Sequence, residues 1–269
     1  MSVPKMPLPR RLTPSLREKV WGTKHLEPWF PHSQMQVGEA WFEGVEDSPL
    51  LIKFVFASEK LSVQVHPNDA YAGIHHQCRG KTEMWYVLAA EPGAKIAAGF
   101  REPVTKEQVR EAAISGNIED LLAWFDVAPG DTFFVPAGTV HALGGGLTLC
   151  EIQQNSDITY RLYDYGRPRE LHLDHALAVS HLGPYPVRQP FREDILVSCE
   201  HFTTKWLRVH DTLGYQPDSS EPCFLVPVEG HGVIGGELIR PGQVWYIPEK
   251  ADLFQISGNI GLLQVSAHS

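Results

Sequence analysis

Short apolar runs separated by turn residues are the feature that most constrains the fold. Segments rich in Val, Ile, Phe, Tyr and Trp recur through the middle of the chain, and 23 Gly and 21 Pro are scattered between them. Many short strands joined by turns are typical of a sandwich or barrel, so the pattern predicts a mainly β protein. Strands are expected at Leu50–Phe56, Leu61–Val65, Met84–Leu88, Thr132–Val135 and Leu147–Gln153.

One region departs from the strand pattern. A capping box at Thr105 begins a helical spacing of apolar residues. Asn117 is placed to cap a second run of the same kind, which ends at Phe125. The sequence therefore predicts a small helical insertion at about residues 103–125, and a further helix at Leu171–His181.

A weak internal repeat suggests two related units. Pro129-Gly130 is followed by the strand-like DTFFV and then Pro136, and Pro241-Gly242 is followed at the same spacing by QVWYI and Pro248. A Pro-Gly turn leading into a short strand is chemically sensible in both copies. We therefore predict units at residues 1–183 and 184–269, divided near the linker-like GPYPVRQP.

Composition and charge narrow the partners. The net charge of −9 argues against broad binding to nucleic acid or to an acidic membrane, and no apolar run is long enough to span a bilayer. The N-terminal residues lack a continuous apolar segment, and the four cysteines form no C-x-x-C pair. We expect a reduced, cytoplasmic protein that acts on a small molecule, and the oligomeric state stays open.

Four residues form a candidate metal site. Gln64 and His66 face the same side if their segment is a strand, Glu83 lies in the next strand-like segment, and His141 follows a Pro-Ala-Gly turn. One amide, two imidazoles and one carboxylate suit zinc or another divalent first-row metal. The alternative is that Gln64 and Glu83 only form hydrogen bonds in a polar barrel mouth.

The spacing of these residues resembles a known family. Gly130, Pro136, Gly138 and His141 match the second cupin motif. The segments LSVQVHPND (61–69), GKTEMWYVL (80–88) and EIQQNSDITYRLYDYGR (151–167) closely resemble type I mannose-6-phosphate isomerases, in their short bacterial form.

The resemblance implies a fold and an activity. It implies cupin-type jelly-roll barrels in two units and a zinc-dependent isomerase that interconverts mannose 6-phosphate and fructose 6-phosphate. The first unit, 1–183, would bind one zinc ion and carry out catalysis. The second unit, 184–269, would be degenerate and metal-free, because Leu253 stands where the repeat places His141.

The resemblance also implies roles for single residues. The metal would be held by Gln64, His66, Glu83 and His141. Arg161 would act in the active site, Lys81 would be a candidate for proton transfer, Ser62 would lie near the phosphate, and Arg167 is a looser match for a phosphate contact. Isomerisation through an enediol needs a base near the carbon-bound proton and stabilisation of negative charge on oxygen. Glu151 is an alternative base to Lys81, and the sequence leaves that choice open.

Two other function classes compete with the isomerase. A non-catalytic sugar-phosphate-binding cupin would keep the basic pocket without needing Lys81, Glu151 and the metal set together. A metal-dependent cupin oxidoreductase would leave Arg161 and Arg167 without an evident purpose. For Arg161 alone, the simpler interpretation is a surface salt bridge with Asp157 or Asp164.

Overall fold

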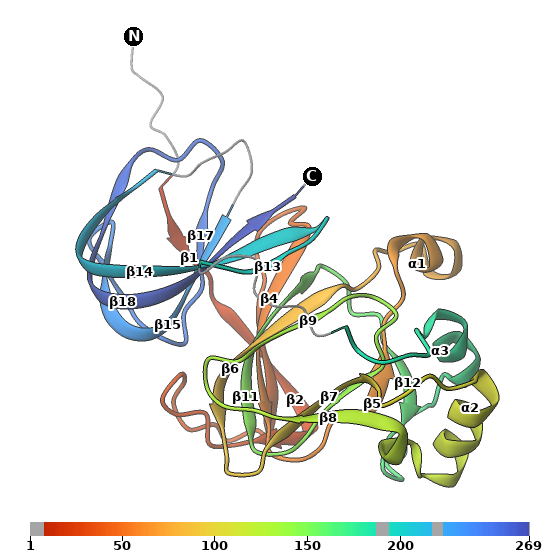
Figure 1. Cartoon of the computed structure of the whole chain (residues 1–269). Coiled ribbons are helices and arrows are strands. Elements are labelled where there is room, and N and C mark those ends of the chain that lie inside the picture. The colour runs from red at the N-terminus through yellow and green to blue at the C-terminus, as the bar shows by residue number, and fades with distance from the viewer. Residues whose placement is uncertain (1–7, 187–193, 217–222, 269) are drawn as a thin grey trace.

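The structure confirms that the protein is mainly β. The structure is a computed structural model, and it describes residues 8–186, 194–216 and 223–268. Within these ranges, three sheets and three α-helices form two lobes, with the helices gathered at the end of the larger lobe that lies away from the C-terminal strands (Figure 1). No helix within the described ranges is long and apolar enough to cross a membrane.

Two facing sheets make up the first lobe. The six-stranded sheet has the order β2-β3-β4-β11-β6-β9, and the five-stranded sheet has the order β12-β5-β10-β7-β8. All the strand pairs in both are antiparallel, as in a jelly roll. The bounds are β2 Pro14–Thr23, β3 Val37–Phe42, β4 Leu50–Ala57, β5 Val63–Val65, β6 Glu83–Ala90, β7 Lys95–Phe100, β8 Leu122–Asp126, β9 Thr132–Val135, β10 His141–Leu143, β11 Leu147–Gln154 and β12 Tyr160–Tyr163.

The second lobe is one seven-stranded sheet. Its main path runs β1-β17-β15-β18-β14-β13, with β16 paired to β15. These strands are β1 Arg10–Arg11, β13 Ile195–Ser198, β14 Phe202–Tyr215, β15 Cys223–Ile234, β16 Glu237–Ile239, β17 Trp245–Ile247 and β18 Phe254–Ala267. The N-terminal β1 pairs with β17, so the first described residues cross to the sheet built by the end of the chain.

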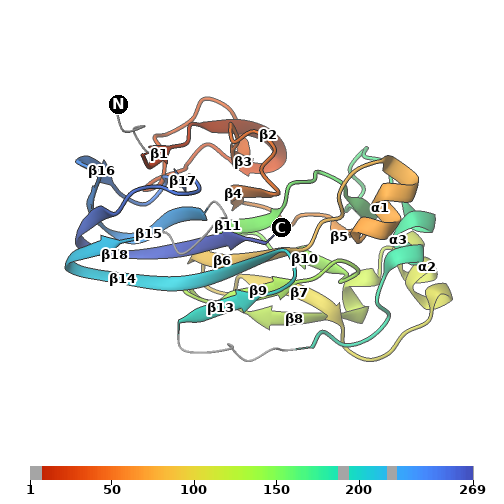
Figure 2. The same ribbon diagram turned by 90° about the horizontal axis from the view of Figure 1, so that it is seen from above.

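A shared apolar core joins the two lobes. Phe54 and Ile152 of the first lobe belong to the same buried cluster as Phe224 and Leu263 of the second. Figure 2 shows the C-terminal sheet lying across β4, β11 and β6. The division at 183/184 stays a prediction, and part of the proposed linker, 187–190, lies outside the described residues.

The helices match the sequence in part. Helix α2, Lys106–Ser115, has the predicted capping box, and α3 spans Leu173–Val179. The second helix predicted after Asn117 is wrong: a four-residue 3-10 turn, Ile118–Leu121, leads into β8. Pairing of this segment with β7 satisfies its backbone groups and outweighs its helical spacing. Helix α1, Asp69–His76, was not predicted.

The Pro-Gly repeat has a structural counterpart. Gly130 and Gly242 both adopt positive φ angles, 97° and 90°, which glycine accommodates without strain. A short strand follows each turn, β9 after the first and β17 after the second. At the position equivalent to His141, Leu253 is 65% exposed. The absence of metal from the second unit stays a prediction.

Candidate active site

Strand register brings the first row of site residues together. In the five-stranded sheet, Gln64 of β5 pairs with His141 of β10 on one side and with Arg161 of β12 on the other. Residues paired directly across antiparallel strands present their side chains to the same face. Arg161, Gln64 and His141 therefore form a row on the sheet.

A second row lies on the six-stranded sheet. Glu151 of β11 pairs with Lys53 of β4 and with Trp85 of β6. Trp85 is two residues beyond Glu83, so the two side chains point to the same face of β6. The facing sheets thus bring motifs from four parts of the chain to one place.

Three of the predicted metal ligands meet in the interior. The Nε2 atoms of His66 and His141 lie 3.6 and 3.5 Å from the two carboxylate oxygens of Glu83. The three side chains are essentially inaccessible to solvent, and one ligand atom from each lies within 4.8 Å of the others. They form a buried group, which we call the His-Glu-His group.

The hydrogen bonding of this group fits a metal ion. The Nδ1 atoms of His66 and His141 each lie 2.9 Å from a backbone carbonyl, of Ile158 and Thr139 respectively. Donation from Nδ1 leaves the Nε2 lone pair facing Glu83, as in metal-binding histidines. His66 Nε2 and both Glu83 oxygens are buried without a hydrogen bond, and of these atoms only Glu83 Oε2 has a cationic partner, the Lys81 ammonium. Leaving the other two atoms unpaired is costly unless a ligand satisfies them.

Electrostatics keep the group in its ligating form. Burial, reinforced by the Lys81 ammonium, lowers the pKa of His66 to about 3, and burial also lowers the pKa of His141. Burial alone would raise the pKa of Glu83, but Lys81 and His66 hold it well below its usual range. Neutral imidazoles and an ionised carboxylate are the species that bind a divalent metal.

Gln64 lies beside the group with its amide oxygen turned away. Its Nε2 is 3.2 Å from His141 Nε2, and its Oε1 accepts a hydrogen bond of 3.1 Å from the Ser62 hydroxyl. A metal ion would be coordinated by the amide oxygen of Gln64, which here accepts a hydrogen bond from Ser62. The ligand role of Gln64 therefore stays a prediction.

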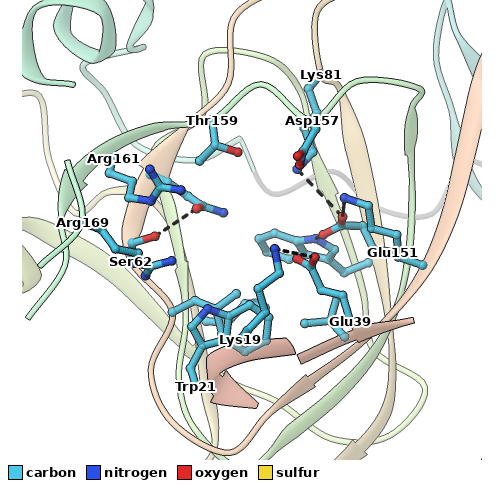
Figure 3. A pocket seen from close by; sticks show the side chains of 16 residues that line it. Lys19, Trp21, Glu39, Ser62, Lys81, Glu151, Asp157, Thr159, Arg161 and Arg169 are labelled. Carbon is cyan, nitrogen blue, oxygen red and sulfur yellow. Dashed lines mark hydrogen bonds and ion pairs between the residues drawn. The ribbon is translucent and has the colours of Figure 1, made fainter. Parts of the chain in front are cut away.

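A polar cavity of about 120 Å³ opens beside Gln64. The predicted residues Ser62, Lys81, Glu151 and Arg161 all line it, and Figure 3 shows Arg161 and Ser62 across the opening from Glu151. Its wall also contains polar side chains to which the sequence patterns assigned no site role: Lys19, Glu39, Lys53, Asp157, Thr159 and Arg169.

Lysines and carboxylates alternate along one wall of the cavity. Lys81 Nζ lies 3.2 Å from Glu83 and 3.9 Å from Glu151, and Lys53 Nζ lies 3.5 Å from Glu151. Burial opposes the charge on Lys81, but the two carboxylates outweigh it and raise its pKa above the ordinary value. Burial, with Glu83, raises the pKa of Glu151, whose Oε2 accepts a 3.0 Å hydrogen bond from Trp85.

The two arginines of the cavity wall, Arg161 and Arg169, differ in their ion-pair partners. Arg161 makes no ion pair with Asp157, Asp164 or any other described residue, and its Nε is buried without a partner. Arg169 also lines the cavity but forms two hydrogen bonds of 2.6 Å with Asp164. The simpler interpretation of Arg161 as a surface salt bridge is therefore wrong.

Arg167 lies apart from the cavity wall. Its guanidinium pairs with Glu59 at 3.1 Å and Asp164 at 3.4 Å and donates to the Lys60 carbonyl at 2.8 Å. It is not among the residues that line the cavity. Its predicted phosphate contact stays a prediction.

Some of the missed residues had a signal in the sequence. Lys53 is the one charged residue in the otherwise apolar run Leu50–Ala57, where a lysine must be paired if it is buried. Asp157 and Thr159 alternate with Arg161, which is the spacing of residues on one face of an extended segment. Lys19 and Glu39 carried no such signal, because their pairing depends on how β2 meets β3.

The fold and the His-Glu-His group define a class. A mainly β jelly-roll protein with a buried group of two histidines and one glutamate beside a polar cavity is a metal-site cupin. The chain matches no protein-family model.

Comparison with known proteins identifies the family within that class. The chain is 40% identical over 232 residues to mannose-6-phosphate isomerase ManA of Bacillus subtilis (strain 168), covering 78% of this chain and 72% of that protein. A crystal structure of the mannose 6-phosphate isomerase from Bacillus subtilis superimposes with a TM-score of 0.84 at 29% identity, covering 96% of this chain and 99% of the other. A zinc-bound mannose 6-phosphate isomerase shares the fold, with a TM-score of 0.75 at 17% identity over 98% of this chain and all of the other. The chain belongs to the mannose-6-phosphate isomerase family.

Proposed function

We propose that the protein interconverts mannose 6-phosphate and fructose 6-phosphate. The observation that carries the proposal is the buried His-Glu-His group beside a cavity lined by Glu151, Lys81 and Arg161. A carboxylate, an ammonium and a guanidinium around one opening supply a proton acceptor and fixed positive charge. Those are the groups that an enediol reaction needs from the protein.

Zinc is the metal that we propose for the His-Glu-His group. Two imidazoles and a carboxylate are a common zinc donor set, and the zinc-bound relative of the same fold supports the choice. Gln64 would complete the set through its amide oxygen. When bound, the ion would polarise substrate oxygens and stabilise the negative charge that develops on them.

Glu151 is the base in our proposal. Its carboxylate faces the cavity, and the hydrogen bond from Trp85 and the two lysines fix its orientation. Lys81 is held against Glu83 at 3.2 Å in its charged form, so it suits charge stabilisation better than proton abstraction. Proton transfer between adjacent carbons would proceed through the Glu151 carboxylate.

Positive charge on the opposite side of the cavity would bind the anionic parts of the substrate. The Arg161 guanidinium has no ion-pair partner among the described residues, and it is placed to stabilise the enediolate oxygen. Ser62 would contact the phosphate. Arg169 shares the cavity wall with them and is the nearer alternative to Arg167 as a second cation.

An assay with mannose 6-phosphate tests the function. We expect metal-stripped protein to be inactive and zinc to restore formation of fructose 6-phosphate, measured by a coupled assay of the product. Binding of the sugar phosphate without turnover, with zinc content confirmed on the same sample, would favour the non-catalytic cupin instead.

Replacing Arg161 with alanine should reduce turnover about a hundredfold, which corresponds to about 3 kcal/mol of transition-state stabilisation. Zinc content and melting temperature should stay unchanged, because no hydrogen bond or ion pair within the described residues joins the Arg161 guanidinium to a predicted metal ligand. Steady-state kinetics separates the roles: a raised KM with unchanged kcat would restrict Arg161 to phosphate binding. Arg110→Ala, on an exposed face of α2, is the matched control.

A further inference from the structure

The loop between β2 and β3 carries a second group of potential metal ligands. One ligand atom each of His25, Glu27 and His32 lies within 4.8 Å of the others, and all three side chains are exposed. The two imidazole centroids are 4.9 Å apart, with their planes at 62°. Among the described residues, these side chains have no hydrogen-bond or ion-pair partner. Apart from the contact between the two imidazole rings, no side-chain interaction among the described residues accounts for their convergence.

The loop backbone holds these residues together. The Ser33 amide donates to the Lys24 carbonyl at 2.9 Å. His25 follows Lys24 and His32 precedes Ser33, so this bond brings the two histidines close together. Within the loop, the amides of Trp29 and Phe30 both donate to the Leu26 carbonyl at 3.1 Å.

Burial fixes the same loop to the body of the protein. Leu26 is 1% exposed, and Trp29 and Phe30 pack against the core cluster that joins the two lobes. Because the fold already orders this segment, a ligand would pay little entropy to bring the three side chains together.

We propose that His25, Glu27 and His32 bind a divalent first-row metal ion such as zinc, with water in the remaining positions. Two imidazoles and a carboxylate match the preferences of zinc, whereas magnesium and calcium prefer oxygen ligands. This site is separate from the His-Glu-His group, because its residues are exposed on a loop and that group is buried between two sheets.

The position of the loop gives the second ion a structural role. The loop connects β2 and β3, which supply Lys19, Trp21 and Glu39 to the wall of the cavity. An ion bound to both arms of the loop would brace this hairpin. It would therefore stabilise the folded protein without touching substrate.

Zinc stoichiometry tests the proposal directly. Wild type, His32→Ala, His141→Ala and the double variant would be dialysed against zinc and their bound metal measured by elemental analysis. We expect about two, one, one and no equivalents per chain. His32 is exposed, so its replacement should leave the fold intact. Equal zinc binding by wild type and His32→Ala would overturn the proposal.

Melting temperature gives a readout independent of stoichiometry. Zinc at a hundredfold excess over its dissociation constant should raise the melting temperature of His141→Ala by several degrees. The double variant should show no such rise, magnesium should be ineffective, and His210→Ala on β14 should behave as wild type. An equal rise with and without His32 would assign the effect to another site. Neither measurement uses turnover, so the result is independent of the proposed isomerase activity.

Discussion

His141→Ala should lose the zinc that we propose for the His-Glu-His group, and its isomerase activity should fall on the order of a thousandfold or more. The variant removes one imidazole and leaves the Glu83 carboxylate with a single histidine partner. A bound metal supplies several kcal/mol of transition-state charge stabilisation, which corresponds to a rate loss of that order. Elemental analysis and steady-state kinetics on the same preparation measure both effects.

The control for this variant is His210→Ala. His210 is exposed on β14 of the second lobe, so its replacement should change neither buried zinc nor turnover. Because zinc on the β2–β3 loop would obscure the count, the pair is best compared in a His32→Ala background. Full retention of zinc by His141→Ala in that background would contradict the assignment of the buried ligands.

Strand register explains why three of the predicted site residues lie on one face of a sheet. Gln64, His141 and Arg161 lie in short motifs at strand positions, where the side-chain direction alternates with every residue. Once the strands pair in register, the direction of each side chain is fixed. The local pattern predicted a shared face only for Gln64 and His66, whereas Arg161 was selected through the family resemblance. The roles of these residues stay predictions.

Two strands that the sequence did not predict form because they pair with distant segments of the chain. Strand β1 has only two residues, too few for any periodic signal, and it forms because β17 offers it a partner. The segment after Asn117 has helical spacing but lies beside β7, which converts it to a strand. In both cases a distant segment determines the local structure.

Arg167 and Arg169 illustrate the same limit in the active site. The two residues have identical chemistry and lie two positions apart, so the motif cannot distinguish them. Both bond Asp164, but only Arg169 reaches the cavity wall, whereas Arg167 turns toward Glu59. The path of the backbone after β12, which the sequence does not specify, makes the difference.

Glu151→Gln should lower kcat by a factor of about 10² to 10⁴, the usual contribution of a general base. Glutamine keeps the size of the side chain and an acceptor for the Trp85 indole, but it cannot accept the proton from the sugar carbon. We expect KM to change little and the zinc content to stay at the wild-type value, because Glu151 bonds none of the three histidine and glutamate ligands.

The same variant distinguishes Glu151 from Lys81 as the base. Glu59→Gln is the matched control, since Glu59 is an exposed carboxylate that pairs with Arg167 away from the cavity wall. Removing the charge of Glu151 also removes the carboxylate that pairs with the buried Lys53 ammonium, which could destabilise the fold. The melting temperature must therefore be measured beside the kinetics. If Glu151→Gln is folded, loaded with zinc and within tenfold of wild-type turnover, Glu151 is not the base. The Lys81 ammonium, 3.9 Å away, would then have to lose its proton despite the two carboxylates that stabilise its charge.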